Sequence, residues 1–325
     1  MVGKRKIAAL LSVLCLSAVF TGCGADEKKK IGISQLVQHE ALDQAREGFI
    51  EGLKEKGYED GKNITIDYKN ANGEVATAQT IAEQFKNDKK DLIFAVATPA
   101  AQAAYNTTKD IPIVFTAVTD PVSAEIAKDW KSSGNNCTGT SDGVSVKAQL
   151  DFVNKIIPDI KTIGVIFNTS EANSIVQVEA LEKEAKERGI NVKRIGVTTV
   201  NEIQQNLTAA AGDIDLLYTP TDNTVASGYA IVGDVCVKNN IPVLGAEPAV
   251  VDKGGLCSLG IDYKQLGKDA AYKAVAILEG KKPSEIEITM TENLSVTINT
   301  DVANKLGITI PQDILDGATK VTGGV

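Results

Sequence analysis

The sequence predicts an α/β protein with two similar lobes, each built around a parallel sheet. Apolar strand-like runs alternate with amphipathic helix-like runs from residue 31 to about 280, which is the pattern of parallel strands joined by right-handed crossovers. The pattern starts again at residue 161, so that the two halves match in outline. The chain has 325 residues, of which 43% are apolar and 23% charged, and these values suit about two globular domains.

The first 23 residues form a separate segment. A basic start, MVGKRK, precedes an apolar run at 7–20 that is short for a membrane span, as in a secretory signal peptide. The following TGC resembles the cleavage motif of bacterial lipoproteins, although Phe20 stands where an aliphatic residue is usual. This resemblance implies a signal peptide at 1–22, a lipid such as palmitate on the thiol of Cys23, and a tether at 23–30. An ordinary secretory signal is the alternative.

The expected elements of the first half follow from periodicity. The helix at 41–56 has an apolar face whose members recur at spacings of three and four residues, and a glycine ends it. The other expected elements are strands at 31–36, 63–71, 91–97 and 111–118, with helices at 75–87 and 99–107.

The second half repeats this order. A strand at 161–168 is followed by a helix at 171–188, and further strands are expected at 191–197, 215–219 and 242–247. Each half contains an aspartate, an apolar run and a Thr-Pro pair, followed by a strand that begins Ile-Pro. We interpret this correspondence as two lobes of similar architecture.

Small oxygen-bearing residues follow the apolar strands at equivalent points in both halves. Thr98 follows one strand, and the run from Thr221 to Asn223 follows its counterpart. In open parallel sheets, ligands bind beyond the carboxyl ends of the strands. Thr98 is a predicted N-cap with Pro99 at N1, and a helix N-terminus favours an anion such as a carboxylate. Helix capping alone is the alternative for each residue taken singly.

Several classes of site lack their usual residues. Gly139–Gly143 matches G-x-S-x-G, but polar residues precede it and the single histidine, His39, lies upstream, which argues against a serine hydrolase. No H-E-x-x-H, G-x-G-x-x-G or P-loop occurs, so neither a metal nor a cofactor is expected. The net charge of −8 does not suit a nucleic-acid partner. The three remaining cysteines, Cys137, Cys236 and Cys257, indicate no disulfide framework.

Several long segments of residues 31–312 resemble the tryptophan/tyrosine-type branch of substrate-binding lipoproteins of ABC importers. The segments that carry this resemblance are 39–63, 91–104, 111–122, 134–142, 164–174, 218–223 and 241–247. It implies a type I periplasmic-binding fold, in which two Rossmann-like lobes are joined by a hinge of three crossovers. Lobe 1 would comprise 31–145 and 249–282, and lobe 2 would comprise 146–248 and 283–325.

The resemblance implies a non-enzymatic function. The protein would bind a free amino acid, aromatic or large and hydrophobic, in the cleft and deliver it to the permease and ATPase subunits of an importer. It would be an extracytoplasmic monomer, lipid-anchored to the bacterial cell membrane. A ligand-sensing lipoprotein that signals to a membrane receptor without transport is the main alternative, and an amidase or hydrolase is a third.

A bound amino acid needs acceptors for its ammonium group and donors for its carboxylate. Asp222 is the predicted ammonium partner, with Glu247 second and Asp120 third. The predicted carboxylate donors and other cleft residues are Gln35, the Thr98 hydroxyl, the N–H groups of Ala100 and Ala101, Asn173, Ser174, Thr221 and Asn223.

Overall fold

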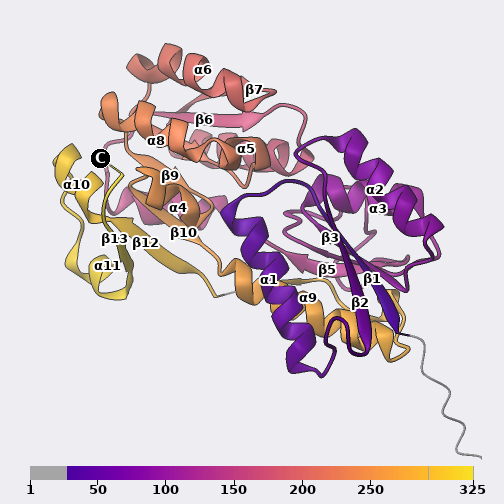
Figure 1. The fold of residues 1–325 in the computed structure, drawn as a ribbon. Helices are drawn as coiled ribbons and strands as arrows, with labels where there is room; N and C mark the ends of the chain where they lie inside the picture. Colours follow the sequence, from indigo (N-terminus) through magenta and orange to yellow (C-terminus); the bar gives the residue numbers. More distant parts are fainter. Residues whose placement is uncertain (1–27, 292, 325) are drawn as a thin grey trace, which may run out of the picture.

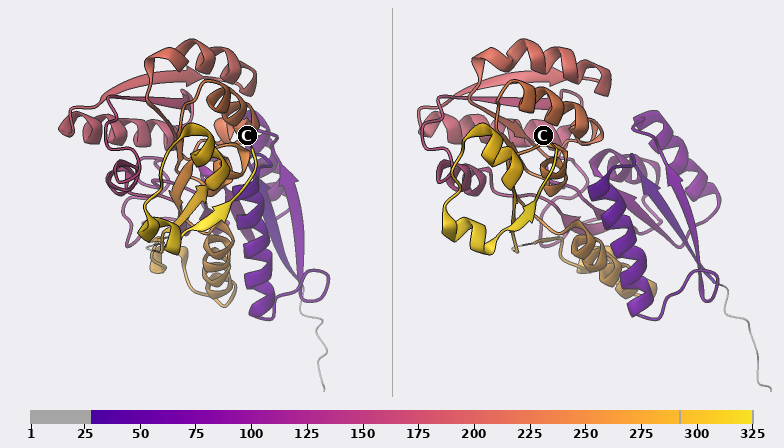
Figure 2. Two further views of the ribbon diagram at one scale, coloured as in Figure 1. Left: turned by 90° about the vertical axis from the view of Figure 1, so that its left-hand side faces the viewer. Right: turned by 60° about the vertical axis from the view of Figure 1, so that its left-hand side comes forward.

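The computed structural model describes residues 28–291 and 293–324 and contains two α/β lobes, each with its own sheet (Figures 1 and 2). The predicted α/β class and the two-lobed architecture are confirmed. The predicted signal peptide, Cys23 and most of the predicted tether lie outside the described residues.

The sheet of lobe 1 has six strands in the order β11-β5-β4-β3-β1-β2, and all of its neighbours are parallel. Its strands are β1 (Lys29–Gln35), β2 (Ile64–Asn70), β3 (Leu92–Val96), β4 (Ile113–Thr116), β5 (Cys137–Ser141) and β11 (Thr289–Met290). The helices of this lobe are α1 (Glu40–Glu55), α2 (Val75–Asn87), α3 (Thr98–Thr107) and α9 (Tyr263–Leu278).

The sheet of lobe 2 has seven strands in the order β13-β12-β10-β9-β8-β6-β7, with one antiparallel pair, β10 and β12. Its strands are β6 (Thr162–Asn168), β7 (Asn191–Val197), β8 (Leu216–Thr219), β9 (Val243–Gly245), β10 (Cys257–Gly260), β12 (Ser295–Asn299) and β13 (Thr319–Val321). Its helices are α4 (Val146–Asn154), α5 (Ala172–Glu187), α6 (Ile203–Ala210), α7 (Asn223–Ser227), α8 (Tyr229–Lys238), α10 (Thr300–Leu306) and α11 (Gln312–Gly317).

The chain passes between the lobes at three places, but two of these differ from the expected positions. The first crossing, between β5 and α4, lies near residue 145 as expected. The return was expected near 248, yet β10 pairs with β9 and β12, so the chain leaves lobe 2 only after Gly260. The last crossing follows Met290 rather than residue 283, because β11 pairs with β5 of lobe 1.

Strand β5 was missed by the sequence analysis because its side chains are polar. The strand CTGTS is fully buried, and its hydroxyls find partners inside the lobe. Thr138 donates to Ile286 O at 2.9 Å, and Ser141 donates to Thr119 O at 2.8 Å. Ser141 is the serine of the G-x-S-x-G match, so its hydroxyl is a structural donor within a strand.

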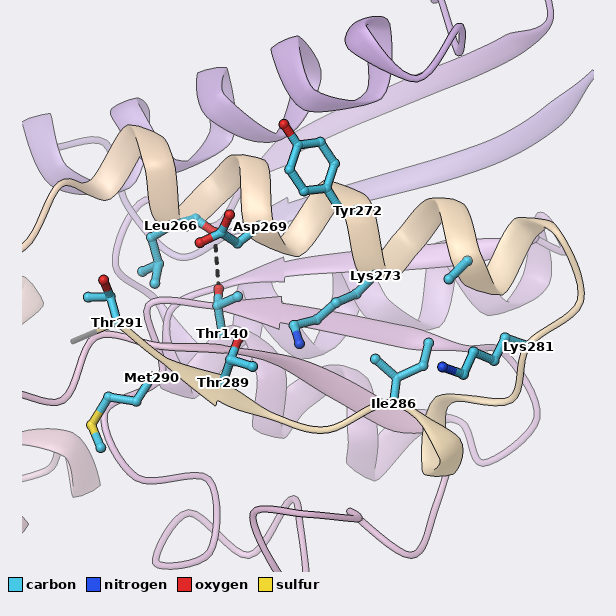
Figure 3. Close-up of a pocket in the computed structure, with 11 residues that line it drawn as sticks. Thr140, Leu266, Asp269, Tyr272, Lys273, Lys281, Ile286, Thr289, Met290 and Thr291 are labelled. Carbon is cyan, nitrogen blue, oxygen red and sulfur yellow. Dashed lines mark hydrogen bonds between the residues drawn. The ribbon is translucent and has the colours of Figure 1, made fainter. Parts of the chain in front are cut away.

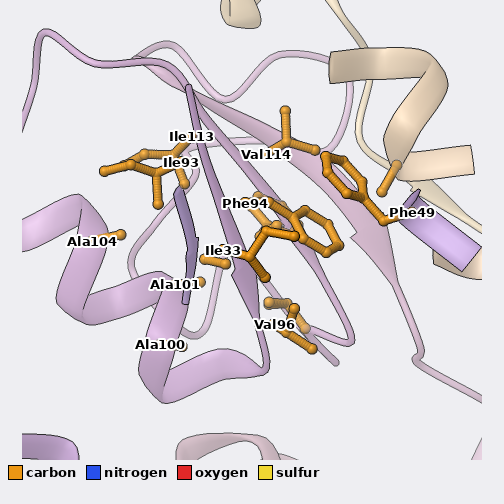
Figure 4. Close-up of a cluster of buried hydrophobic side chains, with 14 of the residues drawn as sticks. Ile33, Phe49, Ile93, Phe94, Val96, Ala100, Ala101, Ala104, Ile113 and Val114 are labelled. Atoms are coloured by element: carbon orange, nitrogen blue, oxygen red, sulfur yellow. The ribbon is translucent and has the colours of Figure 1, made fainter. Parts of the chain in front are cut away.

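The core of lobe 1 lies between its sheet and the helices that cover it (Figure 4). Phe49 of α1 stacks on Phe94 of β3, with ring centroids 3.6 Å apart and an interplanar angle of 8°. On the other face, Ala101 and Ala104 of α3 lie over Ile93 and Ile113 (Figure 4). The rigid sheet therefore fixes the start of α3, which borders the cleft.

Helices α1 and α9 approach until their backbones touch. A Cβ atom on Gly267 would lie 1.9 Å from Ala45 O, and one on Gly48 would lie 2.0 Å from Lys264 O. The obstructing atoms belong to backbone rather than to flexible side chains, so only glycine fits at these two positions.

Gly267→Ala should therefore destabilise the protein, although alanine normally favours a helix. Separating the two helices should lower the free energy of unfolding by about 1–3 kcal/mol, measured by urea denaturation. Gly212→Ala, where a Cβ atom would meet nothing within 4 Å, is the control and should leave stability nearly unchanged. Equal midpoints for the two variants would contradict the close packing.

Candidate functional site

The cleft lies where the carboxyl ends of the two sheets face each other. Thr119, which follows β4, places its Oγ1 2.9 Å from Oγ1 of Thr221, which follows β8. His39, before α1, places Nε2 3.4 Å from Oδ1 of Asn223 in α7. The two lobes are thus in side-chain contact, and polar residues between them are buried.

Asp222 is fully buried and caps helix α7. Its Oδ1 accepts from Val225 N at 2.8 Å, and its Oδ2 accepts from Asn168 N and Ser174 Oγ, each at 2.6 Å. Burial, followed by the nearby Glu171, raises the pKa of Asp222 to about 7. Three protein donors already surround this carboxyl. This agrees with helix capping alone, which is the alternative to a role in ligand binding.

Glu171 connects the neighbours of Asp222 into one network. Its carboxylate accepts from Asn173 Nδ2 at 3.0 Å and from Asn223 N at 3.2 Å. Asn173 Nδ2 also donates to Thr221 O at 2.7 Å. The predicted residues Asn173, Ser174, Thr221, Asp222 and Asn223 therefore lie together, and they bind one another as well as bordering the cleft.

Glu247 differs from Asp222 because its carboxyl is incompletely partnered. The residue follows β9, is 3% exposed, and its Oε2 has no hydrogen-bond partner. Burial raises its pKa well above the usual range, and the negative charges of Asp142 and Asp222 raise it further. An incoming cation would stabilise the ionised form.

Two further unpartnered polar atoms lie beside Glu247. The buried hydroxyl of Tyr229, at the start of α8, lies near Glu247 and Thr219 and interacts with both electrostatically, but neither contact has the geometry of a normal hydrogen bond. Thr219 Oγ1, at the end of β8, is likewise buried without a partner. Three oxygen atoms from separate elements therefore offer free hydrogen-bonding capacity in one place.

The surroundings of Glu247 are acidic. Four carboxyl residues are buried here and interact electrostatically, namely Asp142, Glu171, Asp222 and Glu247. Within residues 28–291 and 293–324, no Lys or Arg forms an ion pair with any of them. Buried charges are normally paired, so this arrangement suits a cationic ligand group.

Lobe 1 contributes hydroxyl groups to the other side of the cleft. Thr98 Oγ1 and Ser34 Oγ are both buried without partners, and they lie at the ends of neighbouring strands. Thr98 is the first residue of α3 rather than its N-cap, which is Ala97 with φ 85°. The N–H of Ala101 already bonds to Ala97 O at 3.0 Å, so the expectation that it is a free donor is wrong.

Two other predicted residues have local partners. Gln35 Nε2 donates to Val37 O at 2.8 Å and to Asp43 Oδ1 at 2.9 Å, which braces the loop after β1. Asp120 accepts from Val122 N at 2.9 Å and from Ser123 N at 3.0 Å, which closes an exposed turn. Both side chains thus make local hydrogen bonds that stabilise their own loops.

Three buried residues of this region, Tyr229, Tyr263 and Asp142, were not predicted from the sequence. Tyr263 OH donates to Asp142 Oδ2 at 3.0 Å, and Thr119 Oγ1 donates to Asp142 Oδ1 at 2.9 Å. Burial raises the pKa of Asp142 to about 6. The tyrosines begin helices, where a sequence pattern shows only an apolar position, and Asp142 lies inside the match to a hydrolase motif.

A cavity of about 480 Å³ opens between the lobes, and Glu171 and Asn223 of the buried network line it. Its wall on lobe 1 contains the apolar residues Leu36, Val37, Val75 and Pro99, with Asn72, Glu74 and Gln102 beside them. Its wall on lobe 2 is polar and includes Asn168, Glu171 and Thr224. The volume falls in the range of small-molecule sites.

A second hollow of about 420 Å³ lies on lobe 1 between α9 and β11 (Figure 3). Thr140 on its floor donates to Leu266 O at 3.3 Å, and Lys273 donates to Glu287 O at 2.6 Å. None of the predicted ligand residues lines it, and none of the buried unpartnered polar atoms found in the described part of the chain belongs to it. The cleft is therefore the better candidate.

Comparison with known proteins agrees with this geometry. Residues 30–322 match the family described as ABC transporter substrate binding protein. The chain belongs to this family. The binding protein is 43% identical over 322 residues to a tyrosine-binding protein of Clostridioides difficile, covering 94% of this chain and 93% of the relative.

Two solved structures indicate the state of the cleft. A Streptococcus pneumonia domain in complex with L-Trp is 35% identical, with a TM-score of 0.87 and coverage of 90% of this chain and 99% of the other. A ligand-free, open substrate-binding protein of Clostridium difficile is more identical, at 46%, with the same coverages but a TM-score of only 0.71. The lobes of this binding protein are therefore arranged more like those of the ligand-bound structure.

Family membership confirms the predicted type I periplasmic-binding fold and the non-enzymatic function. Substrate-binding proteins of this family act outside the cytoplasm. Among the residues that the structure describes, no helix is long and apolar enough to cross a membrane. In the same residues, no group of three or more His, Cys, Asp or Glu could hold a metal ion.

Proposed function

We propose that the cleft binds a free aromatic amino acid and that Glu247 is the counter-charge of its ammonium group. Glu247 Oε2, Thr219 Oγ1 and Tyr229 OH would receive the three N–H bonds of the ammonium. The observation that carries this proposal is the convergence of three buried oxygen atoms without a hydrogen bond of normal geometry, inside an acidic cluster with which no Lys or Arg of the described residues forms an ion pair.

The other groups of the ligand fit the remaining features. Thr98 and Ser34 would donate to the carboxylate from lobe 1, because both hydroxyls are buried and free. The cavity walled by Leu36 and Pro99 would accept the aromatic side chain. The tyrosine-binding relative and the neighbour solved with L-Trp support an aromatic ligand. Asn173, Ser174, Thr221, Asp222 and Asn223 would shape the site through their mutual hydrogen bonds.

A thermal-shift screen of free amino acids tests the ligand class. A ligand that binds only the folded protein stabilises it by about 2.7 kcal/mol at a hundredfold excess over its Kd. Tyrosine, tryptophan or phenylalanine should therefore raise the melting temperature by several degrees. Mass spectrometry of ligand released from the denatured protein would name the cognate one. A shift with sugars or metal ions, and with no amino acid, would show that the ligand class is wrong.

The protein would deliver its ligand, as a monomer, to the permease and ATPase subunits of an importer. Lipid attachment at Cys23 would hold it at the outer face of the membrane, since a doubly acylated anchor is stable where a single chain is marginal.

Cys23→Ala should abolish this attachment. The variant is expected to move from the detergent phase to the aqueous phase in Triton X-114 partitioning, or to persist as an uncleaved precursor on a gel. Cys137→Ala, which changes a buried internal cysteine, is the control and should partition like the wild type. If Cys23→Ala also stays in the detergent phase as a processed protein, the anchor is elsewhere.

A further inference from the structure

His39 is the single histidine of the chain, and it joins the two lobes. It occupies the N-cap position of α1 with an extended backbone, φ −152° and ψ 165°, but its side chain makes no capping hydrogen bond. Instead the ring faces lobe 2, where Nε2 lies 3.4 Å from Oδ1 of Asn223. The histidine is therefore placed for contact across the cleft rather than for stabilising its own helix.

The position of His39 on lobe 1 is held by hydrogen bonds on both sides. Arg46 Nη1 donates to Gln35 Oε1 at 3.0 Å and to Asp43 Oδ1 at 2.9 Å, which ties β1 to the first turns of α1. Gln35 also holds the loop before His39 through Val37 O. These hydrogen bonds hold the loop that carries the His39 ring. The distance from Nε2 to Asn223 Oδ1 therefore depends on how far the lobes are closed.

The chemistry of Asn223 determines the protonation state of the ring. Asn223 Nδ2 donates to the Glu171 carboxylate at 2.5 Å, so Oδ1 is the atom left for the histidine. An amide oxygen accepts only, and Nε2 must therefore carry the proton. In the neutral ring, Nδ1 is then an acceptor, and it is buried without a partner. A second proton on Nδ1 would create a buried N–H with no acceptor.

We propose that His39 is a latch that holds the cleft closed only in its neutral form, so that ligand binding is coupled to release of a proton. His39 is a positioning residue in this scheme, because it acts on the closure of the lobes and touches no reacting or ligand atom. The inference rests on the proposed function, in which an amino acid binds in the cleft between the lobes.

The charged groups around the His39 ring come from both lobes and include both signs of charge. On α1, Glu40 is adjacent and Asp43 favours the protonated ring. From lobe 2, Lys253 and Tyr229 line the same hollow of about 310 Å³, and Glu171 lies behind Asn223. Burial outweighs the hydrogen bond to Asn223 and the charge of Asp43, which both favour the protonated ring, and lowers the pKa of His39 to about 4 in the closed conformation.

The expected pH dependence follows from this difference. An exposed histidine in the open protein has a pKa of about 6.5. Above that value the ring is neutral in both states and affinity is at its full level. As the pH falls, only the open state takes up a proton, so affinity declines and levels off near the lower pKa. At pH 5.0 the loss due to His39 is expected to be about thirtyfold.

The test compares the wild type with His39→Gln by calorimetry with tyrosine, tryptophan and phenylalanine as probes. The glutamine amide can still donate to Asn223 Oδ1 but does not titrate near neutral pH. At pH 7.5 the two proteins should bind within about threefold of each other. Between pH 7.5 and 5.0 the wild type should lose about thirtyfold more affinity than the variant, because the buried acids titrate in both proteins alike.

A second measurement does not depend on the affinity of the variant. Calorimetry of the wild type at pH 5.5, in two buffers of different ionisation enthalpy, should show about one more proton released on binding than in His39→Gln. Equal proton release, or parallel pH profiles, would overturn the latch. Failure of every amino acid to bind either protein at pH 7.5 would instead overturn the proposed function, so the two ideas fail in different ways.

Discussion

Glu247→Gln is expected to weaken binding of the cognate amino acid by about thirtyfold or more. The substitution keeps the size of the side chain but removes the negative charge beside the proposed ammonium site. Loss of the partner of a buried charge typically costs about 2–5 kcal/mol, and 1.4 kcal/mol corresponds to a tenfold change in Kd. Isothermal titration calorimetry at pH 7.5 would measure the difference.

The same variant should behave in the opposite way when no ligand is present. Since burial raises the pKa of Glu247 in the folded protein, its ionisation destabilises the fold as the pH rises above the unfolded value of 4.5. The neutral amide of the variant would lack that penalty, so Glu247→Gln should be at least as stable as the wild type at pH 7 and no more stable near pH 4. Glu179→Gln, which changes an exposed residue of α5, is the charge-matched control. Equal affinities for Glu247→Gln and the wild type would remove the ammonium role from this residue.

Asp222→Asn should lower the free energy of unfolding by about 1–3 kcal/mol. One amide atom can still accept from Val225 N and cap α7, as asparagine commonly does. The other position would carry an NH₂ group facing Asn168 N–H, which donates to Asp222 Oδ2 in the structure. A buried donor would then face another donor. Urea denaturation without ligand measures this effect.

Asp120→Asn is the matched control for this experiment. Asp120 also accepts two backbone N–H groups, but both bond to its Oδ1 and the turn is exposed, so asparagine can replace it. The free energy of unfolding of Asp120→Asn should remain within about 0.5 kcal/mol of that of the wild type. If Asp222→Asn is equally stable and binds ligand at least thirtyfold more weakly, Asp222 is the ammonium partner after all, as the sequence alone suggested.

Periodicity predicted most elements well because their buried faces are apolar. The helix expected at 75–87 and the strand expected at 191–197 have those bounds in the structure. Strand β5 escaped because threonine and serine hydroxyls replace apolar packing there. Strand β10 was assigned to the wrong lobe. It has only four residues and no distinctive pattern, so the sequence does not show which sheet it joins, whereas the structure pairs it with β9 and β12.

The candidate site was harder to predict than the fold. The rule that ligands bind at carboxyl ends of strands located Thr98, Asp222 and Glu247 at the cleft. It could not show which acidic residue binds the ammonium group, because a carboxylate with hydrogen-bond partners and one without them look alike in a sequence. Tyr229 was missed for a related reason, since its value lies in a hydroxyl left without a partner.

The late return of the chain has a consequence for biosynthesis. The face of α1 that carries Gly48 and Gly52 packs against α9, which begins only at Tyr263. As the polypeptide emerges from the ribosome, that face stays uncovered until more than two hundred further residues have been made, whereas β6 to β10 arrive as one uninterrupted stretch. Lobe 2 can thus assemble its central strands first, and lobe 1 must wait for a distant segment, which makes its nascent form the stage most in need of a chaperone.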